Sequence, residues 1–309
     1  MKVILIGFGL IAPKYTEVLE ELGCNISGII TRNYEKTLNK AKEFGIKKVY
    51  RSFDEISEND CDFFITLTSP ENNESTIKKI IKFGKPILAE KPVAFGSSKM
   101  DEIINLKNQY KTKIMVAMNR RFYSNFHYGL KYLEEKDKKL ESIVIEAPER
   151  FSDINSPIFT DIVRKNWIYC NPIHCIDLIR FFGGNITKID TNVVKEQFIY
   201  TAIGKCSKDV GFTYISNWKT PGSWSVTLYA DDVRITYNPL EKGIILKDGN
   251  TEAITLSEYD KKFKPGFYHQ IKYFIDNCVL SNEKSNWPES DLEDHKKTLE
   301  LIEKIHQTN

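Results

Sequence analysis

Long hydrophobic runs are missing from this sequence of 309 residues. No segment approaches the roughly 18 consecutive apolar residues that a membrane-spanning helix requires, so an integral membrane protein is not expected. An excess of charge of one sign is missing too, because 44 basic side chains balance 42 acidic ones to a formal net charge of +2. This balance gives no indication of a nucleic-acid partner or of an anionic membrane partner.

Paired cysteine spacing is also absent. The six cysteines show no C-x-x-C pattern, which argues against a zinc site or a dithiol redox motif. The apolar N-terminal run lacks a basic leader and leads into a glycine turn, so it is expected to be a strand and not a signal peptide. We therefore expect a cytoplasmic protein with reduced, mostly structural cysteines. They are Cys24, Cys61, Cys170, Cys175, Cys206 and Cys278.

The first residues predict a nucleotide-binding turn. A β-branched apolar run over 1–6 leads into Gly7-Phe8-Gly9-Leu10-Ile11-Ala12, and 14–22 has helical spacing. In such a turn Gly7 forms the sharp bend, Gly9 lets the backbone approach a pyrophosphate, and Ala12 allows close packing of helix on strand. The N-terminus of the helix would face the phosphates.

Strand-like and helix-like segments then alternate up to residue 118, which predicts an α/β domain with a parallel sheet covered by helices. Beyond it, 124–134 and 171–182 have helical spacing, whereas 186–256 alternates in and out and is broken by turn residues, as in an antiparallel sheet. Two helices, 267–279 and 291–305, are expected to end the chain. The predicted domains are 1–118, a Rossmann dinucleotide-binding domain, and 119–309, an α+β domain with an open, mainly antiparallel sheet.

Further motifs follow the turn in a characteristic order, and they extend over most of the chain. They are Thr68-Ser69-Pro70, Gly84-Lys85-Pro86, Glu90-Lys91-Pro92, Asn119-Arg120-Arg121-Phe122 and His174-x-x-Asp177. With this set, the sequence resembles the Gfo/Idh/MocA family of NAD(P)-dependent sugar oxidoreductases. The resemblance implies a cytoplasmic enzyme whose second domain binds substrate and forms a homodimer or homotetramer through its open sheet.

The cofactor site is expected along the glycine turn and the ends of the following strands. Its predicted residues are Gly7, Phe8, Gly9, Leu10, Ile11, Thr31, Arg32, Thr68, Ser69, Pro70, Glu90 and Lys91. At the end of the second strand, Thr31-Arg32-Asn33 stands where an acid usually binds the ribose of NAD. Arg32 could pair with the 2'-phosphate of NADP(H), which we therefore favour, while stacking of Arg32 on adenine would leave NAD(H) possible. Glu74 stands at about the place of a histidine that is common in the family.

The resemblance implies that Lys91 polarises the substrate oxygen and that His174 exchanges its proton. Alternatively, Lys91 could be a solvent lysine and His174 a core histidine. Asp177, one helical turn after His174, either orients the imidazole or pairs with a charge. The other histidines, His127, His269, His295 and His306, are expected at the surface.

One departure concerns position 170, where family members often have an aspartate and this chain has Cys170. Either Asn171 binds the substrate hydroxyl, or the proton leaves through water, or activity is weak or absent. Cys170, His174 and Asp177 share one helical face, but a cysteine nucleophile or a metal site is disfavoured, because one helix rarely supplies such geometry and a fourth ligand is not evident. We expect no metal.

The expected substrate is a sugar, a nucleotide-linked sugar or a cyclic polyol, oxidised or reduced at a hydroxyl or keto carbon. The candidates to contact it are Lys91, Asn119, Arg120, Tyr123, Trp167, Asn171 and His174. Arg120 would bind a substrate carboxylate or phosphate, or form an interdomain salt bridge. The alternative is a catalytically silent sensor or regulator with the same dinucleotide-binding fold, which the missing carboxylate favours.

Overall fold

The computed structural model describes residues 1–280 and 289–307. By the density of its internal contacts the chain divides into two compact units. Each unit consists of two segments of the chain. The first unit contains Met1–Asn119 and a later segment that begins at Phe267 and ends at Lys296. The second contains Arg120–Gly266 and the segment that begins at Lys297.

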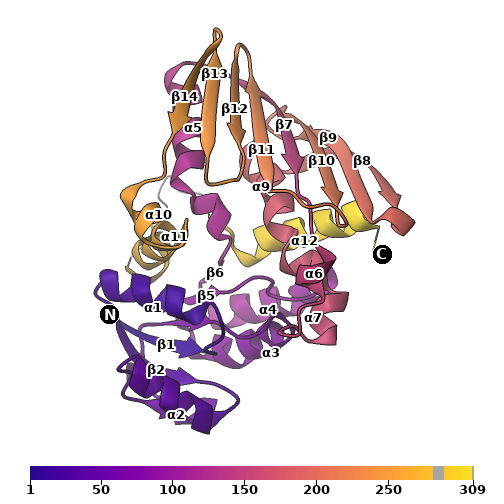
Figure 1. The fold of residues 1–309 in the computed structure, drawn as a ribbon. Coiled ribbons are helices and arrows are strands. Elements are labelled where there is room, and N and C mark those ends of the chain that lie inside the picture. Colours follow the sequence, from indigo (N-terminus) through magenta and orange to yellow (C-terminus); the bar gives the residue numbers. More distant parts are fainter. Residues whose placement is uncertain (281–288, 308–309) are drawn as a thin grey trace. The chain divides into compact units, whose positions relative to one another are not determined.

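The first unit is built on a six-stranded parallel sheet in the order β3-β2-β1-β4-β5-β6. Its strands are β1 (Lys2–Ile6), β2 (Asn25–Ile30), β3 (Val49–Tyr50), β4 (Phe63–Thr66), β5 (Ile87–Ala89) and β6 (Ile114–Val116) (Figure 1). Because the strand order reverses beside β1, a crevice is expected at the carboxyl ends of β1 and β4. This is the edge at which the glycine turn was predicted.

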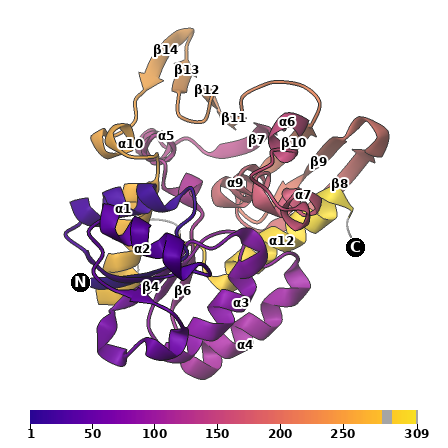
Figure 2. The same ribbon diagram turned by 60° about the horizontal axis from the view of Figure 1, so that its bottom comes forward.

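Both faces of this sheet are covered, as the unbroken apolar sequences of its strands require. Consecutive residues of β4 show it, because the ring of Phe63 packs on Phe274 while that of Phe64 packs on Phe83, which follows α3. The helices are α1 (Ala12–Glu21), α2 (Tyr34–Glu43), α3 (Pro70–Ile80) and α4 (Met100–Tyr110), and Figure 2 shows α3 beside α4.

One segment differs from the predicted domains. Residues 267–280 and 289–296, which the sequence analysis gives to the second domain, are part of the first unit. They include α11 (Phe267–Phe274), the π-helical turn Ile275–Leu280 and the start of α12 (Leu292–His306). The physical reason is aromatic packing: the ring of Phe267 lies 5.0 Å from that of Tyr15 on α1, and Phe274 lies 5.6 Å from Phe63.

The second unit contains an eight-stranded sheet in the order β14-β13-β12-β11-β7-β10-β9-β8 (Figure 1). All its pairs are antiparallel except β7 with β10. The strands are β7 (Leu140–Glu146), β8 (Ile186–Val194), β9 (Ile199–Cys206), β10 (Gly211–Asn217), β11 (Ser225–Ala230), β12 (Val233–Tyr237), β13 (Gly243–Lys247) and β14 (Asn250–Ile254). The mainly antiparallel character is confirmed, whereas β7 lies in a region for which the sequence analysis made no assignment.

Helices cover one face of this sheet. They include α5 (Ser124–Glu135), on β13 and β14, and α9 (Ile173–Gly183), on β7 and β10. The other helices of this unit are α6 (Phe151–Ile154), α7 (Asp161–Lys165), α8 (Trp167–Cys170) and α10 (Glu258–Lys262), with the end of α12. Every residue of α9 is buried, since this apolar helix packs on the central strands β7 and β10.

The opposite face carries an uncharged row, one side chain from each of six adjacent strands. In register across the sheet, the row consists of Ile203, Thr213, Val144, Thr227, Thr236 and Ile244. All six are exposed or half-buried in this chain.

Two of the four histidines that we expected at the surface are buried. His295 is fully enclosed, and His306 lies against the rings of Tyr200 and Trp218. All six cysteines are free. Among the described residues, no helix has the length and apolar character needed to cross a membrane.

Candidate functional site

The glycine turn joins β1 to α1. Gly7 has a φ of +93°, and a Cβ there would lie 2.6 Å from both the carbonyl carbon and oxygen of Leu67, so this position requires glycine for the fold itself. A Cβ at Gly9 would meet only the Leu67 oxygen, at 3.8 Å, an ordinary contact. The protein alone therefore does not require glycine at position 9, which is consistent with close approach of a ligand.

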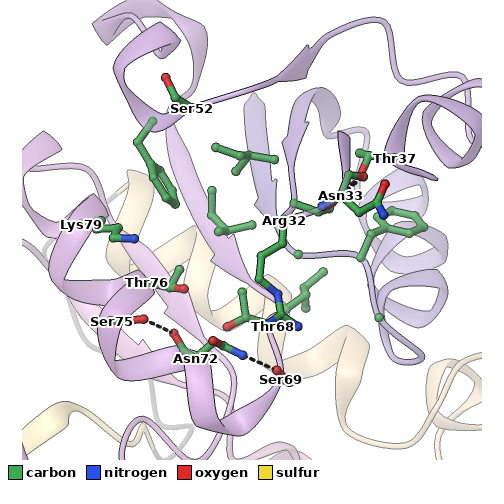
Figure 3. A pocket seen from close by; sticks show the side chains of 18 of the residues that line it. Arg32, Asn33, Thr37, Ser52, Thr68, Ser69, Asn72, Ser75, Thr76 and Lys79 are labelled. Atoms are coloured by element: carbon green, nitrogen blue, oxygen red, sulfur yellow. Dashed lines mark hydrogen bonds between the residues drawn. The ribbon is translucent and has the colours of Figure 1, made fainter. Parts of the chain in front are cut away.

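A pocket of about 900 Å³ lies at this turn (Figure 3). It is lined by the carboxyl ends of β1 and β2 and by the segment after β4, the crevice predicted for a parallel sheet that reverses its order. Of the predicted cofactor residues, the lining includes Gly7, Phe8, Gly9, Thr31, Arg32, Thr68 and Ser69. It does not include Leu10, Ile11, Pro70, Glu90 or Lys91, and the Leu10 side chain is 81% exposed.

Positive charge dominates the ionisable side chains around the pocket. Its lining contains Arg32, Lys36, Lys40, Arg51, Lys79 and Lys82, against Asp54. The sequence analysis identified only Arg32 of this set, since the others come from α2, α3, the turn after α3 and the segment after β3, outside the motifs that it used. Such a lining suits a ligand with several negative charges.

Arg32 lies two residues after the buried end of β2, directly after Thr31. Within the described residues its guanidinium forms neither a hydrogen bond nor an ion pair. Its neighbour Asn33 instead caps α2, accepting a hydrogen bond from the Lys36 amide at 3.0 Å. Thr31 contacts Thr37 through their hydroxyls. Arg32 is thus available to an anion at the pocket.

Lys91 follows β5 in the same unit. Its neighbour Glu90 accepts a hydrogen bond from the Tyr15 hydroxyl at 2.6 Å, and burial raises the pKa of that phenol well above its usual range. Glu74, which stands at about the place of a histidine common in the family, pairs with Lys78 at 2.8 Å and Lys99 at 3.6 Å. The residue beside it, Asn73, is fully buried against the Glu90–Pro92 segment.

In the second unit, four of the side chains predicted to contact substrate lie around two features that the sequence analysis missed. The first feature is Trp224, which precedes β11. The guanidinium of Arg120 lies 5.1 Å from its ring, and the imidazole of His174, near the start of α9, lies 6.4 Å from it. This indole therefore places a broad apolar surface beside a cation and an imidazole.

The second missed feature is Glu149, which follows β7 and is 3% exposed. It accepts a hydrogen bond from Trp167 Nε1 at 2.8 Å and from Asn171 Nδ2 at 3.1 Å. Thus Trp167 and Asn171 are brought together by one buried carboxylate. A glutamate after an unassigned strand gives no local signal of this role.

Two predicted site residues are engaged in other contacts. Asp177 forms a bidentate ion pair with buried Arg121, at 2.7 and 2.6 Å, and accepts a bond from Thr298 at 2.8 Å. These contacts favour charge pairing over orientation of the His174 ring. Tyr123 is buried and donates to Glu241 at 3.1 Å.

Cys170 ends α8, and its thiol contacts the Asn166 carbonyl oxygen at 3.5 Å. Among the described residues, the Cys, His, Asp and Glu side chains form no cluster of three suited to a metal ion. Asn119, the remaining candidate, is buried at the end of the first unit.

The nucleotide-binding domain and the fold both have counterparts among known proteins. Residues 1–118 match the oxidoreductase family with an NAD-binding Rossmann fold, GFO_IDH_MocA. Myo-inositol 2-dehydrogenase of Thermotoga maritima is 24% identical, over 92% of this chain and 89% of the relative. Levoglucosan dehydrogenase in complex with NADH and levoglucosan has a TM-score of 0.82 at 14% identity, over 100% of this chain and 96% of that one.

UDP-N-acetylglucosamine 3-dehydrogenase of Acidithiobacillus ferrooxidans has a TM-score of 0.80 at 15% identity, over 99% of this chain and 97% of that one. At these identities the structural likeness concerns the fold. The matched family model covers the nucleotide-binding domain, so residues 1–118 belong to the oxidoreductase family with an NAD-binding Rossmann fold, and the bacterial relative extends the similarity over most of the remaining chain.

Proposed function

We propose that this protein is a nicotinamide-dependent dehydrogenase or reductase of a hydroxyl or keto carbon in a sugar, a nucleotide-linked sugar or a cyclic polyol. The observation that carries the proposal is the pocket at the glycine turn, in a domain of an oxidoreductase family with an NAD-binding Rossmann fold. In this proposal the first unit binds the dinucleotide and the second binds the substrate and a further copy of the chain.

The pocket residues fit the dinucleotide. Gly9 leaves room for the pyrophosphate, and α1 begins at Ala12, directly after the turn, where the positive end of the helix dipole favours negative charge. Arg32 and the lysines near it favour NADP(H) over NAD(H), because they can pair with a 2'-phosphate. When bound, the dinucleotide would donate or accept the hydride.

For the substrate oxygen, we propose two groups of this chain. Lys91 stabilises negative charge on that oxygen, and His174 takes its proton during oxidation or returns it during reduction. The burial of His174, which is 3% exposed at the start of α9, would limit exchange of its proton with water.

Asn171 then supplies part of the recognition of substrate hydroxyls. A carboxylate only accepts hydrogen bonds, so Glu149 fixes the Asn171 amide with Nδ2 toward itself. Asn171 is half-buried, and no described residue donates to its Oδ1, so this oxygen is available to accept from a hydroxyl. In this proposal Asn171 meets the need that an aspartate at position 170 often meets in the family.

A catalytically silent sensor is the second candidate function, and the specific observation favouring it is the thiol of Cys170 at that position. Such a protein would bind the dinucleotide through the same pocket without turnover. Nicotinamide absorbance at 340 nm, about the usual wavelength for the reduced cofactor, separates the two when wild-type protein is given myo-inositol, levoglucosan and UDP-N-acetylglucosamine in turn. Turnover of any of them supports the dehydrogenase; dinucleotide binding without turnover of any substrate supports the sensor.

For assembly, we propose a homodimer or homotetramer through the open sheet of the second unit. The uncharged row is suited to an interface between identical copies, where a charged row would place like charges together. Thr227→Lys, at the middle of the row, should reduce the mass found by sedimentation equilibrium to that of the monomer. An unchanged mass would contradict the proposed interface. A cytoplasmic location stays a prediction, consistent with six free cysteines.

A further inference from the structure

The segment Glu90–Lys91–Pro92 is held on both sides by one side chain. Asn73, on α3, is 0% exposed. Its Nδ2 donates to the carbonyl oxygen of Glu90 at 2.9 Å and to that of Pro92 at 3.0 Å. These carbonyls belong to the residues immediately before and after Lys91 in the chain.

The polarity of this contact is fixed. Backbone carbonyls only accept hydrogen bonds, so both protons of the Asn73 amide are committed to them. Its Oδ1 accepts from the Thr68 hydroxyl at 2.6 Å. Because this hydroxyl hydrogen is directed to Asn73, the Thr68 hydroxyl can only accept hydrogen bonds from a ligand in the pocket that Thr68 lines.

Other contacts restrain the same segment. The amide of Lys91 donates to Glu90 Oε2 at 3.2 Å, and Tyr15 donates to Glu90 Oε1 at 2.6 Å. Beyond Pro92, the amide of Val93 donates to Nε2 of buried His295 at 3.4 Å. Of these groups, Asn73 alone contacts the chain on both sides of Lys91.

We propose that Asn73 is a positioning residue: by binding the two carbonyls that flank Lys91, it fixes the direction in which the Lys91 amine leaves the backbone. Its relevance to turnover rests on the proposed function, in which Lys91 acts on the substrate oxygen. On α3, the carboxylate of Glu74 pairs with Lys78, whereas the neighbouring Asn73 is buried. A single asparagine next to Glu74 gives no local signal of this role in the sequence.

The test observes Lys91 directly and needs no substrate. The lysines are dimethylated with ¹³C-formaldehyde, and the Lys91 signal is assigned by its loss in Lys91→Arg. In Asn73→Asp, an oxygen replaces Nδ2, so an acceptor faces the two carbonyl oxygens that Nδ2 binds. In Asn73→Ser, the short hydroxyl cannot reach both of these carbonyl oxygens. We expect the apparent pKa of Lys91 to move by about half a unit or more in both variants.

The matched control is Thr112→Val. Thr112 is a buried residue of the same unit whose hydroxyl donates to the Ile81 carbonyl at 2.8 Å, away from Lys91. We expect Thr112→Val to lose about as much thermal stability as the Asn73 variants and to leave the Lys91 signal unchanged. If Asn73→Asp does not fold, the Lys91 signal is measured in Asn73→Ser. A Lys91 signal unchanged in a folded Asn73 variant would overturn the proposal.

Turnover separates this inference from the proposed function. With an active substrate, both Asn73 variants should lose about tenfold or more in kcat while Thr112→Val stays within about twofold. A Lys91 signal that moves in a protein without turnover on any substrate would support the positioning role and contradict the dehydrogenase.

Discussion

The two carboxylate oxygens of Glu149 each lie 3.1 Å from Nδ2 of Asn171, and this buried contact fixes which atom of the amide faces away. Glu149→Gln removes the charge and lets the amide reverse. We expect KM for the substrate to rise two- to tenfold, about the effect of one hydrogen bond, with the dinucleotide Kd unchanged. The control is Glu146→Gln, an exposed carboxylate of the preceding strand. Equal changes of KM in both variants would contradict the role of Glu149.

The glycines of the turn should separate folding from binding. Gly9→Val is expected to abolish dinucleotide binding in calorimetry with little change in melting temperature, because a Cβ at this position meets only the Leu67 oxygen at 3.8 Å. Gly7→Ala is expected to lower the melting temperature, because its φ is +93° and a Cβ would lie 2.6 Å from Leu67 backbone atoms. Unchanged cofactor affinity in Gly9→Val would show that the pocket is not the dinucleotide site.

Cofactor preference should depend on Arg32. Loss of a charge-assisted pair costs about 1.5–3 kcal/mol, so Arg32→Ala should weaken NADPH binding about ten- to a hundredfold and NADH binding little. Fluorescence titration of the reduced cofactors gives both constants. Arg234→Ala, an exposed arginine in the second unit, serves as the control for net charge. Equal losses for both cofactors would argue that Arg32 does not meet the 2'-phosphate.

His306 should make stability depend on acid pH. Burial lowers its pKa from 6.5 to about 3 in the folded protein. The unfolded chain therefore binds more protons between these values, so the contribution to stability is complete above about pH 6.5 and is lost as the pH falls toward 3. His306→Phe, which keeps a ring against Tyr200 and Trp218, should remove this slope, at most about 1.4 kcal/mol per pH unit. Urea denaturation at pH 7, 6, 5 and 4 measures it; parallel curves for both proteins would contradict the prediction.

The sequence predicted the regular parts of the fold because their signals are local. The alternation up to residue 118, the glycine turn and the antiparallel pattern of 186–256 all depend on neighbours in the chain. The strand β7 was not predicted, because Leu140–Glu146 has charged residues among its apolar ones. It occupies the centre of the sheet only through its pairing with β10 and β11. Likewise, the packing of Phe267 on Tyr15 joins residues far apart in sequence.

For the candidate site, too, the sequence indicated the residues in local motifs and missed those whose roles depend on distant contacts. Motif residues such as Gly7, Thr68 and Arg32 line the pocket, and their contact with a dinucleotide stays a prediction. Asn73 and Glu149 were missed because their roles come from hydrogen bonds to distant parts of the chain, and a single asparagine or glutamate has no characteristic spacing. Asp177 has the predicted helical spacing from His174, but its strongest partner, Arg121, comes from another element.

The central claim is hydride transfer assisted by Lys91 and His174, and turnover in a single set of variants tests it most directly. Once a substrate is found by nicotinamide absorbance, Lys91→Ala and His174→Ala should each lower kcat at least about a hundredfold in protein that still binds cofactor. The double variant should be scarcely worse than the worse single one, since groups of one catalytic unit do not contribute additively. Cys170→Ser should retain most activity. Turnover that survives the loss of Lys91 and His174 but disappears in Cys170→Ser would contradict the account in favour of a thiol mechanism.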